Sequence, residues 1–403
     1  MNSIRRSWIR RLLALGALAL LVIGTSGAAA AAEEIVWSVH VGITGPAAFS
    51  GSKQAEGFQD YVAWKNANGG IRGRTIKLLM TDTTFQPAEA VAGFKRVLSN
   101  YKPVYVSGDG TAMTKALNAE NNSTYDILMT SGSFATEFDD TKTYPLHFMA
   151  GPSYGDMIEI ALKYVRAQYT GSGTPKVAMV HSNIAFGRDP VERLEQVAKR
   201  LKIDVALIQQ TKFVETDVGS FALAIRQARP DFVVFHGYAF SVWPEIMRQV
   251  KEYGLDTKFL GTIWAMDRIK VMEIGPAADG YMGVQPYPYS TTGRSEPILK
   301  VIDKIMRDKN PKYDGQAQIG YFHSWANALL ATKAIEMTID KGQPLTGTNL
   351  ANNLRTVTDW DTGGMFGTKV NISGQKIGVG RIYRWNAKKD WTPEPVSDWI
   401  TTD

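Results

Sequence analysis

Short apolar runs rich in β-branched residues alternate with longer amphipathic segments along most of this chain. The apolar runs predict strands, and segments in which apolar residues recur every three or four positions, such as 53–67, predict helices. We expect strands at 35–41, 75–80, 104–107, 127–130, 176–181, 204–208, 232–235 and 259–260, and further helices at 87–98, 157–168, 191–201, 221–228 and 242–253. Repeated strand–helix units predict parallel sheets covered by helices on both faces.

Two such runs are separated at Pro152, and the second ends at a segment rich in proline and tyrosine, 285–290. Later elements are expected as helices at 296–307 and 321–339 and as strands around Lys369 and Arg381. The chain is long enough for two lobes of ordinary domain size. The pattern therefore predicts an α/β protein with two doubly wound lobes and a ligand cleft where the carboxyl ends of their strands face each other.

The N-terminal residues are typical of an export signal. Arg5, Arg6, Arg10 and Arg11 form a basic head, an apolar run at 12–23 follows, and an alanine tract occupies 28–32. This order is the signal-peptide pattern, and the apolar run is shorter than the roughly 20 residues of a transmembrane helix. We expect a signal peptide at 1–32, cleaved after Ala32, and a periplasmic protein. A membrane anchor is the alternative, and the Arg5–Arg6 pair leaves Sec and twin-arginine export both open.

Composition excludes several classes of site. The chain has no cysteine, which rules out thiolate nucleophiles and cysteine metal sites, so its stability must come from a packed core. The formal net charge is +6, most of it in the four arginines of the basic head, and no basic stripe indicates a nucleic-acid partner. The histidines show no metal-ligand spacing, although His181 and His236 end predicted strands and could line the cleft. Without a GxSxG elbow, a GxGxxG motif or a phosphate loop, we expect no enzyme, cofactor or metal.

A series of spaced elements begins at the end of the first predicted strand. They are the strings 41–48 (VGITGPAA) and 66–74 (NANGGIRGR), Gly51, Gly57, Asp82 and the string 87–91 (PAEAV). In this order they resemble the periplasmic binding proteins for leucine, isoleucine and valine, within the wider type I group. The resemblance covers nearly all of the chain after Ala32 and is strongest over 35–91.

The resemblance implies the type I periplasmic binding protein fold, with three inter-lobe crossings near Pro152, Gln285 and Gly378. Lobe 1 would comprise 33–152 and 285–378, and lobe 2 would comprise 153–284 and 379–403. Members of this family close on a small ligand by a hinge and present it to an ABC permease. The implied function is that of an extracytoplasmic solute-binding protein of an ABC importer for amino-acid-like ligands.

The resemblance also implies ligand-binding residues. The loop 108–111, with Asp109, Gly110 and Thr111, corresponds to the loop that holds a ligand carboxylate. The loop 131–134, with Ser133 and Phe134, corresponds to a second such loop, although Ser and Thr at these junctions also serve as helix caps. Ser50 takes the place of an aromatic residue that relatives often have. In the second lobe, Phe186 and Tyr238 would cover the ligand.

Two departures from the family pattern bear on the ligand. Ile263 replaces the acid that holds the ammonium group in amino-acid binders, and Trp264 follows it. Asp267 or Asp109 could substitute, but neither is aligned to that role. A buried ammonium without a counter-charge is strongly unfavourable, so we expect a carboxylate or amide ligand with a branched or aromatic body, for which an amine is not required. The second departure concerns Phe85 and Gly110, which occupy positions joined by a disulfide in some relatives.

Two alternatives to an importer protein stay open from the sequence. One is a sensor that binds the same ligand and signals through a separate membrane partner. The other is an enzyme acting on a periplasmic small molecule, a function for which the sequence supplies no grouped acid, base and nucleophile.

Overall fold

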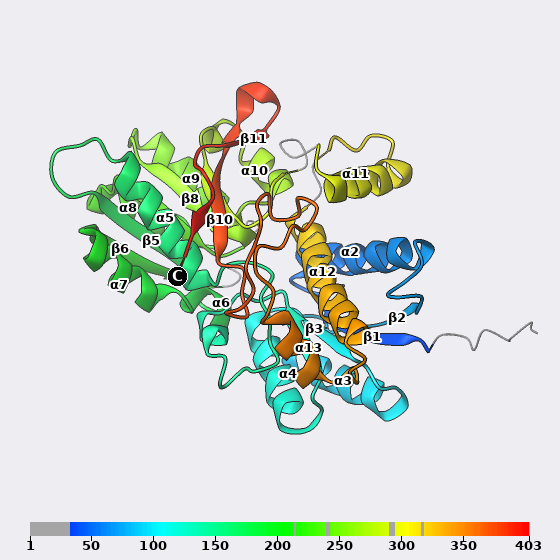
Figure 1. Ribbon diagram of the computed structural model, residues 1–403. Coiled ribbons are helices and arrows are strands. Elements are labelled where there is room, and N and C mark those ends of the chain that lie inside the picture. The colour runs from blue at the N-terminus through cyan, green and yellow to red at the C-terminus, as the bar shows by residue number, and fades with distance from the viewer. Residues whose placement is uncertain (1–32, 213–214, 239–241, 290–294, 316–317, 403) are drawn as a thin grey trace, which may run out of the picture.

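The computed structural model describes residues 33–212, 215–238, 242–289, 295–315 and 318–402, so the expected signal peptide at 1–32 lies outside the described residues. Two β-sheets, each with helices packed against it, form the molecule (Figure 1). The prediction of a two-lobed α/β protein is confirmed. We refer to the elements packed on the first sheet as lobe 1 and to those packed on the second sheet as lobe 2.

The first sheet is fully parallel, with the strand order β2-β1-β3-β4. Its strands are β1 (Ile35–Val41), β2 (Ile76–Asp82), β3 (Tyr105–Gly108) and β4 (Leu128–Ser131). The helices that connect them are α2 (Ala48–Ala67), α3 (Pro87–Asn100) and α4 (Thr111–Thr124), and the 3-10 helix η1 (Thr136–Asp139) follows β4. Because the strands are parallel, their carboxyl ends share one edge of the sheet, which β1, β3 and β4 leave at Gly42, Asp109 and Gly132.

The second sheet has the strand order β11-β10-β9-β8-β7-β5-β6, with β12 paired to β10. Its strands are β5 (Lys176–Ser182), β6 (Asp204–Thr211), β7 (Phe232–His236), β8 (Lys258–Gly261), β9 (Met282–Gln285), β10 (Val379–Asn386), β11 (Thr392–Pro395) and β12 (Ile400–Thr401). The first five are mutually parallel, and β10 to β12 extend the sheet in antiparallel fashion.

Helices cover this second sheet. They are α5 (Tyr154–Gln168), α6 (Ala185–Arg188), α7 (Val191–Leu201), α8 (Gly219–Ala228), α9 (Trp243–Glu252) and α10 (Arg268–Ile274), with 3-10 helices η2 (Ile263–Ala265), η3 (Gly275–Ala278) and η4 (Ala387–Lys389). A capping box starts α5: Ser153 Oγ accepts from the Asp156 N–H, and the Asp156 carboxylate accepts from the Ser153 N–H. This local signal begins lobe 2 directly after Pro152.

After β9 the chain returns to lobe 1. The elements there are α11 (Pro297–Lys309), α12 (Ile319–Asp340) and α13 (Gly347–Leu354). Helix α12 lies along α2 (Figure 1), where Tyr61 Oη donates to Thr332 Oγ1 at 2.8 Å. The close approach depends on Gly57, since a Cβ there would lie 2.6 Å from the Tyr321 carbonyl oxygen. The chain then re-enters the second sheet at β10, and the residue boundaries of the lobes remain a prediction.

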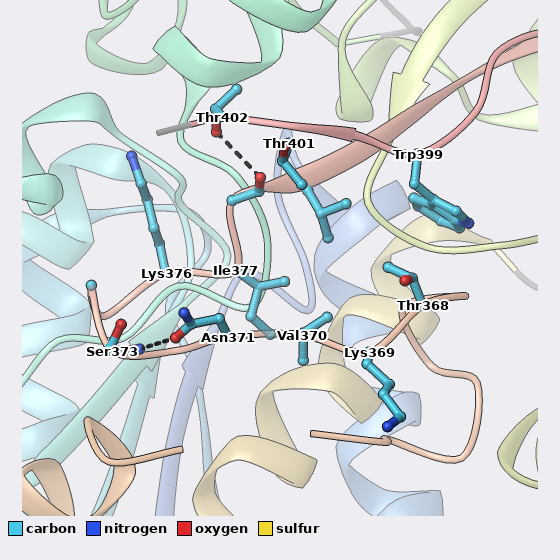
Figure 2. Close-up of a pocket in the computed structure, with 13 residues that line it drawn as sticks. Thr368, Lys369, Val370, Asn371, Ser373, Lys376, Ile377, Trp399, Thr401 and Thr402 are labelled. Carbon is cyan, nitrogen blue, oxygen red and sulfur yellow. Dashed lines mark hydrogen bonds between the residues drawn. The ribbon is translucent and has the colours of Figure 1, made fainter. Parts of the chain in front are cut away.

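The C-terminal segment braces the connection into β10 (Figure 2). The Thr402 N–H donates to the Gly378 carbonyl at 2.9 Å, and β12 pairs with Val379 and Gly380. Trp399 packs so closely on Gly367 that a Cβ at that glycine would lie 2.2 Å from its ring. A cavity of about 530 Å³ lies between this segment and residues 368–379.

Some local expectations were wrong. No strand forms around Lys369, where the described residues contain only an isolated bridge between Trp360 and Val370. Conversely, β9 ends at Gln285, the first residue of the predicted connector, and helices α4 and α13 were not expected. The pattern around Lys369 is apolar enough for a strand, but none of the strands in the described part of the chain pairs with this segment.

Candidate functional site

Aromatic side chains gather where the carboxyl ends of the parallel strands of the two sheets face each other. Lobe 1 contributes residues from the first turn of α2, the loops after β2 and β4, and helix α12. Lobe 2 contributes residues from α5, α6, η2, the last residue of β7 and the loop after it. We call the following residues the aromatic cluster: Phe49, Phe85, Phe134 and His323 of lobe 1, and Tyr154, Phe186, His236, Tyr238 and Trp264 of lobe 2.

Ring contacts in the aromatic cluster join the two lobes. The Phe134 and Trp264 ring centroids are 6.4 Å apart, and those of Phe49 and Tyr238 are 5.6 Å apart. Within lobe 2, Phe186 lies 4.9 Å from Tyr238, and Trp264 Nε1 donates to Tyr154 Oη at 3.1 Å. Tilted and edge-on rings at these separations are favourable arrangements for aromatic pairs. The predicted residues Phe134, Phe186, Tyr238 and Trp264 are therefore brought together.

The two predicted carboxylate loops are joined by their hydroxyls. Thr111 Oγ1 and Ser133 Oγ lie 2.7 Å apart, and Ser133 Oγ also accepts from the Ala135 N–H. Gly110 is the N-cap of α4 and gives this helix no side-chain cap, so the first amides of α4 are not capped by a side chain. Uncapped amides beside two hydroxyls suit an anion, because the positive end of the helix dipole lies there.

Asp109 and Ser50 lie next to these loops and are connected through Gln54. The Asp109 carboxylate accepts from the Gly42 N–H at 2.9 Å and from Gln54 Nε2 at 3.1 Å, while Gln54 Nε2 also lies 3.3 Å from Ser50 Oγ. Burial raises the pKa of Asp109. Ser50 lies inside the first turn of α2 rather than in the preceding loop. Both residues contribute to the framework around the Gly110–Thr111 junction.

Asp267 is bound by its own lobe and by lobe 1. One oxygen accepts from the Lys270 N–H at 3.1 Å and caps α10, and the other accepts from Gln318 Nε2 at 3.0 Å. Burial raises the pKa of this carboxyl group as well. Ile263, at the position where an acid was expected from relatives, is fully buried in η2. Its alkyl side chain offers no partner for an ammonium group.

The two cluster histidines are neutral and structurally engaged. His236 Nε2 donates to the Phe186 carbonyl at 3.0 Å, and Nδ1 lies 2.8 Å from Thr262 Oγ1. His323 Nε2 donates to the Ser131 carbonyl at 2.7 Å, which lets α12 position the loop 131–134. Burial lowers the pKa of His236 to about 3 and that of His323 to about 4.

Sequence reasoning missed several cluster members, and His181 does not join them. Tyr154 was missed because α5 begins three residues earlier than its periodicity indicated, and its signal was the capping box at Ser153. His323 has no local signal, since it lies inside a helix far along the chain from the strand ends. His181 lies one residue before the end of β5, and its Nδ1 is 3.3 Å from the adjacent Ser182 carbonyl oxygen.

A hydrogen-bonded contact beside the aromatic cluster also joins the lobes. The Asp189 carboxylate, after α6, accepts from the Thr136 N–H at 2.9 Å and from Thr136 Oγ1 at 2.5 Å. Burial raises the pKa of Asp189 to about 6, and the charges of Glu137 and Asp139 act in the same direction. The nearby cations are engaged elsewhere: Arg193 binds Glu159, and Lys376 binds Asp139 and Asp156.

We expect Asp189→Asn to stabilise the protein above pH 6. The native pKa of about 6 exceeds the ordinary value near 3.9, so the native state binds this proton more tightly than the unfolded state does. The associated stability is present below about pH 4 and is lost as the pH rises through about 6. Asparagine keeps an acceptor for Thr136 without the charge, and the gain should reach about 2 kcal/mol, allowing for partial solvent screening.

Urea unfolding at pH 4.5 and pH 7.5 measures this effect. The variant Glu192→Gln, which removes an exposed charge from the neighbouring helix α7, is the control and should change the free energy of unfolding by less than about 0.5 kcal/mol. Equal stability of wild type and Asp189→Asn at pH 7.5 would contradict the assignment of an uncompensated charge.

The described residues contain neither a candidate metal site nor a candidate membrane span. Within the described residues, no group of three histidine, aspartate or glutamate side chains could hold a metal ion. In the same part of the chain, no helix is both long and apolar enough to cross a membrane.

The family model for periplasmic binding proteins matches residues 39–390. Among curated proteins, the Leu/Ile/Val-binding protein of Escherichia coli is 23% identical over 279 residues, covering 69% of this chain and 75% of that protein. An amino acid binding protein of Pseudomonas aeruginosa is 26% identical over 282 residues, covering 67% of this chain and 71% of that protein.

Solved structures share the fold at low identity. A branched-chain amino acid ABC transporter protein from Thermus thermophilus with bound valine gives a TM-score of 0.80 at 19% identity, covering 92% of this chain and 97% of that one. A solute-binding protein from Rhodopseudomonas palustris BisB5 in complex with 3,4-dihydroxybenzoic acid gives a TM-score of 0.73 at 16% identity, covering 91% of this chain and 97% of that one. These likenesses confirm the predicted type I periplasmic binding fold.

Proposed function

The chain belongs to the periplasmic binding protein family, and from this premise we propose that it is the extracytoplasmic solute-binding protein of an ABC importer. It binds a small carboxylate or amide ligand between its lobes and delivers it to a membrane permease. The similar proteins named above are binding proteins rather than enzymes, which supports this class. The family description supports a periplasmic location. We propose that the chain reaches it after cleavage at Ala32, on the basis of the N-terminal pattern.

The aromatic cluster is the observation that carries the proposal. It lies between two lobes at the carboxyl ends of their parallel strands, where α/β sheets bind ligands. Its members come from both lobes, so a ligand held among them would favour the arrangement in which the lobes meet. Hinge closure around a ligand uses this coupling.

The polar end of the site supports an anionic or amide ligand. Thr111 and Ser133 offer hydroxyls beside the uncapped amides of α4, and each hydrogen bond to a charged acceptor is worth about 1.5–3 kcal/mol. We place the carboxylate or amide there, with Asp109, Gly110 and Ser50 supporting the loop, and we place the apolar body against Phe134, Phe186, Tyr238 and Trp264. The valine and dihydroxybenzoate complexes of similar folds are consistent with either body.

The ligand does not need an amine for tight binding. Ile263 provides no charge, and the Asp267 carboxylate already accepts hydrogen bonds from the Lys270 N–H and from Gln318 Nε2. An ammonium buried against these groups would lose its hydration without an aligned counter-charge. We therefore favour a branched or aromatic acid over an amino acid.

A matched ligand series tests this chemistry. We expect 4-methylpentanoate, which is leucine without its amine, to bind at least as tightly as leucine, and benzoate to bind as well. The methyl esters of these acids should bind at least tenfold more weakly, because the loss of a charge-assisted hydrogen bond costs about 1.5–3 kcal/mol. Isothermal titration calorimetry measures all the affinities. Leucine binding far more tightly than its deaminated acid would refute the amine-independent site.

Two further measurements separate the remaining classes. Recovery of chemically intact ligand after denaturing the complex supports a receptor, whereas steady product formation would indicate an enzyme. A sensor would bind the same ligands, so ligand uptake in cells lacking the chain distinguishes it from an importer component.

A further inference from the structure

A strained turn leads from strand β2 into the rim of the site. Thr84 and Phe85 are consecutive non-glycine residues in the left-handed region, with φ of 47° and 61°. This conformation is unfavourable for an L-residue, and for a β-branched residue such as threonine it is an outlier. Strained backbone of this kind persists only where surrounding contacts hold it.

The contacts that hold the turn are specific. The Asp82 carboxylate accepts from the Thr84 N–H at 3.0 Å and from Thr44 Oγ1 at 2.6 Å, which ties the turn to the loop after β1. The Gln86 N–H closes the turn on the Thr83 carbonyl at 2.7 Å. The Thr84 side chain itself is exposed, so the strain is not required by packing of that side chain.

The turn places the Phe85 ring against the loop 108–111. A Cβ at Gly110 would lie 2.8 Å from two atoms of this ring, so the ring lies directly over the N-cap of α4. Between the lobes, the Phe85 and Tyr238 ring centroids are 6.4 Å apart, and the Phe49 ring centroid lies 5.6 Å from that of the same Tyr238. Phe85 and Phe49 are only partly buried, whereas Phe134 and Trp264 are at most 4% exposed, which places the former pair at the rim.

We propose that Phe85, carried by the strained Thr84–Phe85 turn, is the residue that gates ligand entry and release. This inference rests on the proposed function. With the turn as observed, the Phe85 ring covers the first backbone N–H groups of α4, which bind the carboxylate or amide group of the ligand. The ring thereby excludes water from that group. When the turn relaxes, the ring leaves Gly110 and Tyr238, and the acid end of the ligand is exposed. The strain keeps the two arrangements close in free energy, as a gate requires.

Two substitutions should act in opposite directions. Phe85→Ala removes the ring and leaves the site open, so the backbone amides of 108–111 should exchange hydrogen about tenfold faster. The lost aromatic contacts and apolar burial should shift the equilibrium between the closed and open arrangements by more than a factor of ten. Thr84→Asn places a residue that tolerates the left-handed region at the strained position. It should keep the turn closed, slow the same exchange about fivefold and raise the melting temperature.

Hydrogen–deuterium exchange of the free protein, followed by mass spectrometry of peptides that cover 105–117, provides the first readout. Phe221→Ala, which removes a half-buried phenylalanine from α8 in lobe 2, is the matched control and should leave this peptide unchanged. Equal exchange in wild type and Phe85→Ala, or faster exchange in Thr84→Asn, would overturn the proposal. Because no ligand is present, this readout does not depend on the ligand class.

Stopped-flow dissociation of 4-methylpentanoate and benzoate provides the second readout. We expect about tenfold faster release from Phe85→Ala and slower release from Thr84→Asn, in the same order as the exchange rates. Release rates unchanged by both substitutions would overturn the gate. If neither acid binds the wild-type protein, the proposed ligand class fails, while the exchange measurement still decides the role of Phe85.

Discussion

Replacing Trp264 with alanine is expected to weaken ligand binding by about 30- to 1000-fold, which corresponds to about 2–4 kcal/mol. The indole lies within 6.5 Å of Phe134, Tyr238 and His323, measured between ring centroids, and therefore touches both lobes. Its Nε1 also orients Tyr154 through a 3.1 Å hydrogen bond. Alanine would remove the apolar wall and leave the buried Tyr154 hydroxyl without this donor. Calorimetry with benzoate and 4-methylpentanoate measures the loss.

Two variants separate a binding role from a structural one. Trp264→Phe keeps a ring and should retain most of the affinity while removing any change in Trp264 fluorescence on binding. Trp64→Ala removes a partly buried indole from α2, where it packs on Tyr61 and Trp325, and should lower stability without affecting affinity. A Trp264→Ala protein that melts like the wild type and binds both acids equally well would contradict the placement of the ligand in the aromatic cluster.

The substitution Gly51→Ala is expected to destabilise the protein by about 3 kcal/mol and to abolish binding. A Cβ at this position, in the first turn of α2, would lie 2.1 Å from the Gly42 carbonyl oxygen, which is backbone and has no flexible end to move aside. Overpacking of this kind costs about 1–3 kcal/mol and sometimes more. The forced shift would also displace the Gly42 N–H from Asp109 and so disturb the loop 108–111.

Gly219→Ala is the matched control, because it also lies in the first turn of a helix but has open space around the added Cβ. Alanine lowers the conformational entropy of the unfolded chain, which should make that variant about 0.4–1 kcal/mol more stable. Thermal and urea unfolding compare the two variants, and calorimetry compares their ligand affinities. Wild-type binding by Gly51→Ala would show that α2 and the loop after β1 can separate without effect on the site.

The order and type of most elements could be predicted from local pattern. Strands such as β1 and β7 and helices such as α7 appear within a few residues of their expected bounds, because apolar periodicity and helix-capping residues act over one or two turns. The same signals indicated two parallel sheets, and the family resemblance placed Thr111 and Ser133 at strand ends. The missing strand around Lys369 shows the limit, since a strand needs a partner that periodicity cannot supply.

The fold alone decided which of these residues meet. Thr111 and Ser133 share a hydrogen bond because β3 and β4 are neighbours in the sheet. Phe85 rests on Gly110 because the loops after β2 and β3 leave the same edge of the sheet, on either side of β1. Tyr154 and His323 enter the aromatic cluster only through the packing of α5 and α12. Asp267 was a candidate ammonium partner, yet its oxygens bind Lys270 and Gln318, the latter across the lobes.

The physical reason is the sequence distance over which the interactions act. Periodicity, caps and turn residues report interactions between residues a few positions apart, and the sequence by itself determined the α/β class, the two lobes and the strand ends where a ligand would bind. Contacts such as that of Ser131 with His323 join residues separated by 192 positions, and they depend on the register and packing of whole elements. Only the tertiary structure decided the membership of the aromatic cluster and the position of Phe85 at its rim.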